Sequence, residues 1–504
     1  MSHDYFNKKL KMDKIKNSPP KTNEIQTLWG IEIYNRLKLF PWWVSYHKGN
    51  TVESELRENI ISIGHKLGMK DKWLKKILRH TVSEFSKKGL GSDYYGYHNI
   101  QHELEAAYFT LLSIDGLCQS KRYEITRNDI CYLFVSALFH DYDPGKEFDK
   151  PNEDCVEFYI RNDKKITRLI EEAGLDLNIV VALIHRTAYP FEGKIADHAR
   201  NKIQRLMCKN STTRGDAYTT QKIEKLGWLL SVSERMAGYA LGGIEHARDM
   251  ARRNAHALGW HPSVINKNSV KFFDYLMKNE KEMFDMVISA VPQQFRTNFY
   301  NNVANFKESW NKELSLRDLK KGSKLVFVTE NNSTDISNAT IADLLEVFGT
   351  VPTLMRINEN EFIKSIHDLN SIIVTMRLDE PDGKIIGYAK GGPLECYSLR
   401  PGTIDRYYGR RNTVYLEGIS VIEGYWGGTG GHYLRIKFLN EALGRRYKFL
   451  TGYAHRDVIL QRRKKLEMID IVRKYDPDML DYYRIDLNNS IYKKTMVDSY
   501  DLIC

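Results

Sequence analysis

The chain has 504 residues, too many for one typical hydrophobic core, so more than one domain is expected. It carries 75 Lys and Arg against 64 Asp and Glu, a formal charge of +11. We interpret this excess as solvated helix faces, which argues against a nucleic-acid partner but suits anionic, phosphorylated ligands. Its six cysteines form no C-x-x-C pair, which argues against a zinc knuckle or a disulfide framework. The longest apolar run, ICYLFVSALF, is half a membrane span, so we expect a soluble, cytoplasmic protein without a membrane partner.

The chain divides by pattern into four segments. Residues 1–24 are rich in Lys and Asn and end in a Pro pair, which predicts a disordered arm. Residues 25–310 show apolar positions every three or four, as in VESELRENIISIGHKLG, so this part is expected to be all-α. A charged segment, 311–322, is interpreted as a linker, and residues 323–504 are expected to form a mixed α/β domain.

Strand-like runs define the second half. They are KLVFVTE, SIIVTMRL, KIIGYAKGG, TVYLEGISVI and YKFLTGYAH. The second and third flank DEPDG, a turn signal that predicts an antiparallel hairpin. With helical patterns between the other strands, the sequence indicates an α/β domain around a mostly antiparallel sheet.

Two short motifs in the first half combine imidazole and carboxylate groups. The stretch YGYHNIQHELEAAYF puts His98 and His102 four residues apart, on one face of a helix. Farther along, ICYLFVSALFHDYDPGK delivers His140 and Asp141 at the end of an apolar helix, with Asp143 close behind. Neutral imidazoles and carboxylates suit a hydrolytic divalent metal rather than a thiolate-bound structural zinc. Such an ion polarises a phosphoryl oxygen and acidifies a bound water.

Together the motifs YHNIQH and ALFHDYDPG resemble the HD-domain metal-dependent phosphohydrolases, in particular the cyclic-nucleotide phosphodiesterase-like branch. The similarity covers about residues 55–260. It implies that His98 is the general acid that protonates the leaving oxygen. It also implies that His102, His140 and Asp141 bind a divalent metal, for which Mn, Mg, Fe and Zn all remain open.

Some residues depart from the pattern of that family. Asp143 matches its second, catalytic Asp, but the His expected between Asp143 and Pro144 is missing. Glu234, in LLSVSERMAGYALGG, stands where the family has an Asp as its last metal ligand. His185, in VALIHRTAYPFEG, is a candidate ligand for a second metal, with a structural role as the alternative.

A glycine cluster in the second half follows a strand and precedes a helix, in TVYLEGISVIEGYWGGTGGHYLRIKFL. Backbone amides and the helix dipole converge at such a turn and favour an anion. A dinucleotide fold would need a third glycine where Tyr433 stands after Gly428 and Gly430. A P-loop would need Gly-Lys-Ser/Thr, but Gly431 is followed by His432.

The remaining pattern resembles the pyrophosphate loop of the GNAT acyltransferase superfamily, over about residues 323–487. Tyr425 stands where that family usually has Arg or Gln. The resemblance implies that acetyl-CoA binds at the loop, with Val421 on the preceding strand holding the pantetheine arm by backbone hydrogen bonds. The loop residues are Gly427, Gly428, Thr429, Gly430 and Gly431.

Acyl transfer to an amine needs a base for the amine and an acid for the thiolate. Glu417, on the strand before the loop, is the candidate general base, acting through water. Tyr453 or Tyr483 is the candidate acid, with packing as the alternative for either tyrosine.

These observations lead to one main hypothesis and two rivals. The main one is a fused enzyme, an HD phosphohydrolase for a small nucleotide-like phosphoester joined to a GNAT-type transferase that uses acyl-CoA and an amine acceptor. The first rival makes the HD half a catalytically weak nucleotide sensor that regulates the acetyltransferase. The second rival is a scaffold in which both sites are degenerate.

Overall fold

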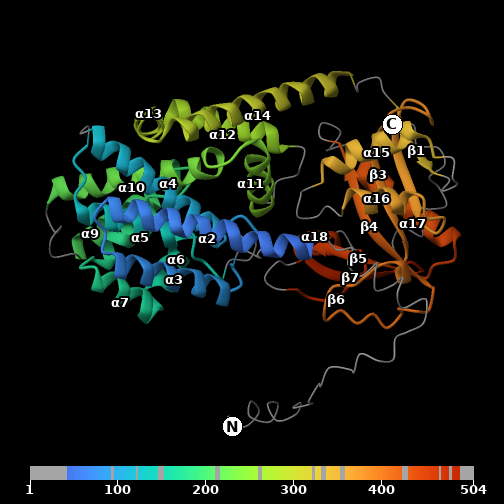
Figure 1. Cartoon of the computed structure of the whole chain (residues 1–504), viewed down its shortest axis with the longest axis horizontal. Coiled ribbons are helices and arrows are strands. Elements are labelled where there is room, and N and C mark those ends of the chain that lie inside the picture. The colour runs from blue at the N-terminus through green and yellow to red at the C-terminus, as the bar shows by residue number, and fades with distance from the viewer. Residues whose placement is uncertain are drawn as a thin grey trace, which may run out of the picture.

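The computed structural model describes residues 42–91, 96–120, 123–145, 152–209, 216–258, 264–319, 324–330, 336–351, 358–422, 430–464, 467–475 and 480–488. The expected arm, residues 1–24, lies outside these ranges. Figure 1 shows an all-helical half beside a half built on a β-sheet. The expected fold class, an all-α part followed by an α/β part, is thereby confirmed. None of the helices in the described ranges is long and apolar enough to cross a membrane.

The helical half packs around four central helices, α4, α5, α8 and α10, which contact one another. Their side chains are buried along most of their length, which explains why these segments are apolar nearly all round rather than on one stripe. The helices are α2 (Trp42–Lys66), α3 (Asp71–Lys87), α4 (Ile100–Ser120), α5 (Arg127–Phe139), α6 (Glu153–Asn162), α7 (Lys164–Glu172), α8 (Leu177–His185), α9 (Gly193–Lys209), α10 (Ala217–Ala240), α11 (Ile244–Ala257), α12 (Ile265–Asn279), α13 (Lys281–Ala290) and α14 (Gln293–Leu319).

Helix α14 carries the chain from the helical half toward the sheet (Figure 1). It continues through most of the segment expected as a linker, residues 311–322, and ends at Leu319. Charged residues such as Lys, Glu and Arg are good helix formers, so a charged run extends a helix as readily as it forms a linker.

The second half is a sheet of seven strands in the order β1-β2-β3-β4-β5-β7-β6. Neighbouring strands are antiparallel except β4 and β5, which are parallel, and the expected β2–β3 hairpin is confirmed. Strands β6 and β7 are absent from the sequence expectations. The elements of this second half are β1 (Leu325–Thr329), α15 (Asn338–Gly349), α16 (Glu359–Ile366), β2 (Ile372–Leu378), β3 (Ile385–Pro393), a 3-10 turn (Leu394–Cys396), β4 (Thr413–Val421), α17 (Gly430–Gly444), β5 (Phe449–His455), α18 (Arg456–Lys464), β6 (Ile469–Arg473) and β7 (Leu480–Asp486).

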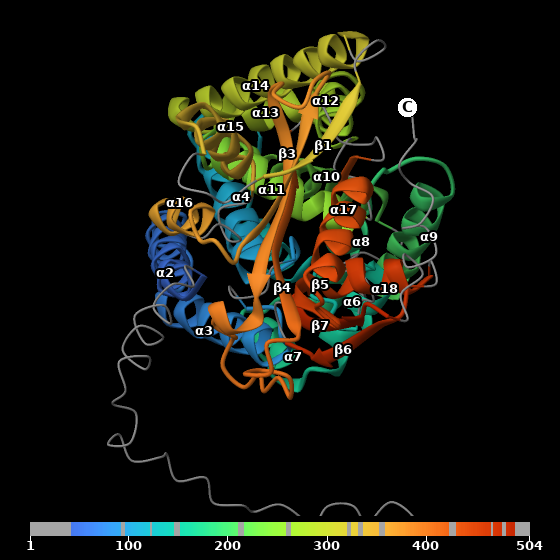
Figure 2. The same cartoon turned by 90° about the vertical axis from the view of Figure 1, so that its right-hand side faces the viewer.

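Helices cover both faces of this sheet. A Cβ on Gly387 or Gly391 of β3 would meet side chains of α17, so α17 packs closely on that face. On the other face, Phe362 of α16 contacts Tyr388 of β3 at a ring distance of 5.5 Å. Figure 2 shows β3 and β4 as long strands with α17 beside them. The two faces form separate hydrophobic clusters, both distinct from the core of the helical half.

Candidate functional site

Helix ends place the three central residues of the first site. The side chain of Asn99 accepts hydrogen bonds from the backbone amides of Gln101 and His102, at 3.0 and 3.1 Å, and so caps α4. This explains the Asn of the His-Asn-x-x-His motif as a helix cap. His140 ends α5 and Asp141 follows it, so both side chains lie beside the first turn of α4.

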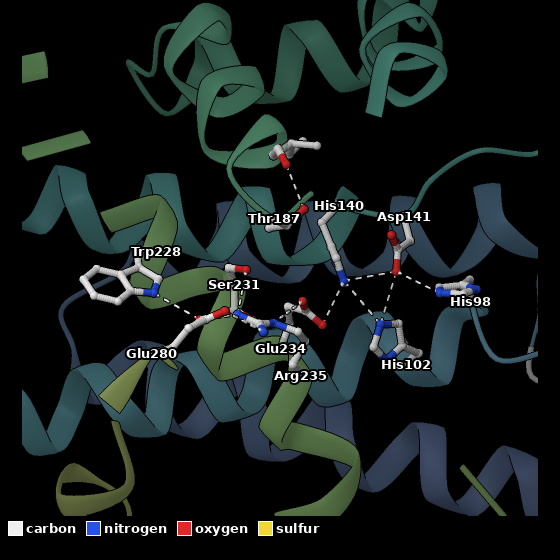
Figure 3. A network of polar contacts seen from close by, with 11 residues as sticks. His98, His102, His140, Asp141, Thr187, Trp228, Ser231, Glu234, Arg235 and Glu280 are labelled. Atoms are coloured by element: carbon white, nitrogen blue, oxygen red, sulfur yellow. Dashed lines mark hydrogen bonds and ion pairs between the residues drawn. The ribbon is translucent and has the colours of Figure 1, made fainter. Parts of the chain in front are cut away.

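Four side chains converge at this point (Figure 3). The Nε2 atoms of His102 and His140 lie 3.2 Å apart. Oδ2 of Asp141 lies 3.3 Å from Nε2 of His102 and 3.2 Å from Nε2 of His140. Oε2 of Glu234, from α10, lies 3.9 Å from Nε2 of His140. All four residues are buried, so three helices and the turn after α5 enclose one small polar centre.

The donor set and its spacing fit a divalent metal ion. Two ligands bound to one ion at ~2.1 Å lie roughly 3.0–3.4 Å apart when their bonds are 90° to 109° from each other. The three separations among His102, His140 and Asp141 fall in this range. His102, His140 and Glu234 also offer ligand atoms within 4.8 Å of one another. Imidazole and carboxylate groups with no thiolate suit Mn, Mg, Fe or Zn.

Strong electrostatic coupling accompanies this spacing. Burial would raise the pKa of Asp141, but His140 and His98 outweigh it and hold that pKa far below its ordinary value. Burial would lower the pKa of His140, but Asp141 and Glu103 raise it well above its ordinary value. Burial raises the pKa of Glu234 to about 8, against the opposing effect of His140. A cation bound among these groups would compete with protons for them.

Glu103 is a member of this site that the sequence reasoning missed. Its Oε2 lies 2.9 Å from Nδ1 of His140, which also lies 3.0 Å from the carbonyl oxygen of Ala137, and Glu103 is fully buried. The second nitrogen of a metal-binding histidine commonly faces a carboxylate, which fixes the orientation of the ring. The sequence signal for Glu103 was a carboxylate inside the apolar helix that carries His102. Adjacent residues on a helix normally face different directions, so this position beside His102 did not suggest a shared site.

His98 and Asp143 lie at the edge of the centre. Nε2 of His98 is 3.7 Å from Oδ2 of Asp141, farther than either central histidine. Oδ1 of Asp143 accepts a hydrogen bond from the amide of Gly145 at 3.2 Å and so holds the turn after α5. Neither side chain belongs to the groups of potential metal ligands found among the described residues.

Arg235 lies next to Glu234 and forms a buried ion pair with Glu280. Its guanidinium lies 3.7 Å from Glu234 and donates two hydrogen bonds to Glu280, at 3.0 and 2.6 Å (Figure 3). Glu280 also accepts a hydrogen bond from the indole of Trp228 at 3.1 Å. This buried network connects α10 to the start of α13.

His185 joins a different cluster. Its Nε2 lies 3.0 Å from Glu157 of α6, and Asp154 completes a group of possible ligands. The ammonium of Lys202 lies 2.7 Å from Asp154 and 3.5 Å from Glu157. The ammonium group of Lys202 therefore already neutralises these carboxylates, which supports a structural role for His185 rather than a role as a metal ligand.

The second candidate site lies where strands β4 and β5 stop pairing. The parallel pairing of β4 with β5 covers only Thr413–Tyr415 and Phe449–Thr451, although both strands continue. Val421, at the far end of β4, pairs with Gly387 of β3. Of the predicted phosphate loop, Gly427, Gly428 and Thr429 lie outside the described residues.

Helix α17 begins at Gly430, where that loop ends. A Cβ on Gly430 would lie 2.6 Å from Sδ of Met376, whereas one on Gly431 would meet nothing within 4 Å. Gly430 thus has a packing reason to be glycine, because it lets the start of α17 approach β2.

The candidate acid and base of the second half have different partners. Oε2 of Glu417 contacts Nζ of Lys390 and accepts a hydrogen bond from Tyr397 at 3.2 Å. The hydroxyl of Tyr453 instead accepts a hydrogen bond from the amide of Arg400 at 2.8 Å. Tyr483 is a buried residue of the sheet core. The tyrosine that contacts Glu417 is therefore Tyr397, which sequence reasoning missed together with Lys390.

Comparison with known proteins gives structural matches to both halves. The phosphodiesterase domain of a RhoPDE fusion protein from the choanoflagellate Salpingoeca rosetta matches with 12% identity, a TM-score of 0.34, and 52% of this chain and 93% of that chain covered. GCN5 from Tetrahymena matches with 12% identity, a TM-score of 0.24, and coverage of 32% and 96%. The putative acetyltransferase yncA from Salmonella typhimurium, solved with its cofactor acetyl-CoA, matches with 14% identity, a TM-score of 0.23, and coverage of 32% and 94%. No family model and no curated protein sequence matches the chain.

Proposed function

We propose that the helical half is a metal-dependent phosphohydrolase for a nucleotide-like phosphoester. The observation that supports this most directly is the buried triangle of His102, His140 and Asp141, whose donor atoms lie 3.2 to 3.3 Å apart. Glu234 is the fourth ligand in this proposal. A divalent ion held there would polarise a phosphoryl oxygen and acidify a water molecule.

Each remaining residue of the site has a role in this proposal. His98 stands beside the triangle rather than in it, 3.7 Å from Asp141, and donates the proton to the leaving oxygen. Glu103 holds the ring of His140 so that Nε2 faces the centre. Asp143 acts on the reaction by fixing the turn that carries His140 and Asp141.

Metal analysis combined with a hydrolysis assay tests the first site. We expect the purified chain to bind Mn²⁺ or Mg²⁺ and to hydrolyse a cyclic nucleotide or an aryl phosphodiester. His102→Ala should lose most of the metal and the activity, because an inner ligand is removed. His198→Ala is the matched control, since His198 is exposed and pairs with Asp154 outside the site. Unchanged metal content in His102→Ala would exclude this site.

For the second half we propose an acyl-CoA-dependent N-acyltransferase. The supporting geometry is the end of the β4–β5 pairing at Tyr415, short of the far end of β4, together with a helix, α17, that begins at Gly430 directly after the glycine loop. In this proposal the backbone of Val421 on β4 hydrogen-bonds an extended pantetheine arm, and the amides at the start of α17 bind a pyrophosphate. In this proposal residues 427–431 bind the cofactor and Glu417 is the base. Calorimetry with acetyl-CoA on the whole chain tests it, and the absence of binding would remove the assignment.

A nucleotide-sensing role for the helical half is the second candidate function. It is favoured by Glu234, which stands farther from His140 than Asp141 does, at 3.9 Å, and whose pKa is raised to about 8 by burial. A weak fourth ligand is compatible with binding a nucleotide without turnover. Nucleotide binding without hydrolysis, combined with a change in acyl transfer, would favour this candidate.

A further inference from the structure

The contact between Lys390 and Glu417 places an amine beside the candidate base of the second half. In the pairing of β3 with β4, Lys390 faces Gly418 and Gly391 faces Leu416, so Glu417 falls at a shift of register. At such a bulge the side chain points in a different direction from the one that regular strand alternation would give it. Oε2 of Glu417 receives both Nζ of Lys390 and the hydroxyl of Tyr397.

Lys390 is unusual in its burial. The residue has 0% exposure, and its Nζ lies 5.2 Å from the ring of Phe362 of α16. A lysine is almost never fully buried unless its charge is paired. Its partner, the Glu417 side chain, keeps 14% of its surface exposed. The amine is therefore enclosed, and its partner carboxylate is the part of the pair that solvent reaches.

Open space lies beside Gly418, the cross-strand neighbour of Lys390. Gly418 faces Lys390 across the strand pair, and a Cβ built on it would meet nothing within 4 Å. Residues 417–420 of β4 are only partly buried, beyond the point where the pairing with β5 ends. Cross-strand partners point to the same face of a sheet, so the open space lies on the face that carries Lys390.

We propose that Lys390 is an internal acyl acceptor, which the second half acylates with its own acyl-CoA. The inference rests on the proposed acyl-CoA site. A transferase base works on the amine that it touches, and the amine that Glu417 touches in this structure is the chain's own.

The reaction balances without a further reagent. Nζ of Lys390 gives one proton to Oε2 of Glu417 and attacks the thioester carbonyl. The N–C bond forms, the C–S bond breaks, and the thiolate leaves with the second proton of the amine as CoA-SH. Glu417 then releases its proton to solvent. The acylated side chain is a neutral amide, so Glu417 keeps only the hydroxyl of Tyr397 as partner.

Peptide mapping of the whole chain after incubation with acetyl-CoA tests the inference. We expect acetylation of Lys390 in the wild type, and none at that position in Lys390→Arg. Glu417→Gln should slow the modification by about 10²- to 10⁴-fold, the usual contribution of an acid-base group. Lys384 is the internal control, because it is exposed and pairs with Glu346 on the surface, so its acetylation reports solution chemistry.

The outcomes separate this inference from the acyl-CoA assignment. Acetyl-CoA binding by calorimetry without acetylation of Lys390 would overturn the internal acceptor and leave the acyl-CoA site standing. No acetyl-CoA binding at all would remove both. Equal acetylation of Lys390 and Lys384, insensitive to Glu417→Gln, would also overturn the inference. The decisive measurement uses the wild-type chain, so it does not depend on the folding of a variant.

Discussion

At the scale of single residues, His140 has two different environments on its two ring nitrogens. Nε2 faces His102 and Asp141, while Nδ1 lies 2.9 Å from Glu103 and 3.0 Å from the carbonyl oxygen of Ala137. A carboxylate at the second nitrogen orients the ring and makes the first nitrogen a better ligand. The metal affinity of this site should therefore depend on a residue that does not touch the metal.

Glu103→Gln should weaken metal binding by about 10- to 100-fold, the usual cost of losing such a partner. A chelator competition assay measures this dissociation constant. Glu105→Gln is the matched control, because Glu105 lies on the same helix and accepts a hydrogen bond from Gln101 at 2.8 Å. Equal losses in the two variants would refute the orienting role of Glu103.

His98→Ala should separate proton donation from metal binding. His98 stands 3.7 Å from Asp141, outside the three close donor atoms, so the variant should retain its metal. Hydrolysis should fall by about 10²- to 10⁴-fold, as expected for the loss of a general acid. Metal content and turnover are measured on the same sample. Metal loss as severe as that of His102→Ala would make His98 a ligand instead.

At the scale of elements, the position of α10 is secured by one buried ion pair. Both nitrogens at the end of the Arg235 guanidinium bond to Glu280, and both side chains are only 8% exposed. Removing one partner of such a pair leaves a buried charge without compensation. Because Glu234 precedes Arg235, this pair lies next to the proposed fourth metal ligand.

Glu280→Ala should lower the free energy of unfolding by about 3 to 5 kcal/mol, because Arg235 would stay buried and charged. Urea denaturation followed by circular dichroism measures this change. Lys281→Ala is the control at the next position, where an exposed pair with Asp285 contributes little. A similar small effect in both variants would contradict the role of the buried pair.

Helix α17 offers a second test at this scale, at its first two residues. Gly430→Val should push α17 away from β2, since a Cβ there would meet Met376 at 2.6 Å. We expect acetyl-CoA affinity to fall at least about tenfold, because the amides of the first turn would move. Gly431→Ala should bind normally, since its Cβ would meet nothing within 4 Å. Calorimetry compares the two, and unchanged binding by Gly430→Val would contradict this geometry.

At the scale of the whole molecule, the two halves have separate hydrophobic cores. The core of the helical half and the two clusters of the sheet half share no residue. Coupling between sites requires an element that changes state with both ligands. Separate cores favour two activities that operate side by side over regulation of one half by the other.

Removing the metal with a chelator should therefore leave the dissociation constant for acetyl-CoA unchanged within about twofold. Calorimetry on the whole chain, with and without the chelator, measures this. The same titration with a cyclic nucleotide present serves as the second arm. A change of about tenfold or more in either arm would support the sensor hypothesis.

The sequence by itself determined the fold class and the β2–β3 hairpin, and its motifs contain three side chains that the structure brings together, His102, His140 and Asp141. Helical periodicity, a turn signal and motif spacing are local properties, so they can be interpreted without coordinates. His102, His140 and Asp141 were accessible in this way because they lie at the ends of two helices, each marked by a motif.

Only the tertiary structure decided which distant groups meet. Strands β6 and β7 were missed because their charged residues look solvent-exposed, whereas Asp481 is buried and paired with Arg456. Glu103 and Lys390 were missed for the same physical reason. A buried charge is tolerated only where a partner from another element neutralises it, and that partner is invisible in the local sequence.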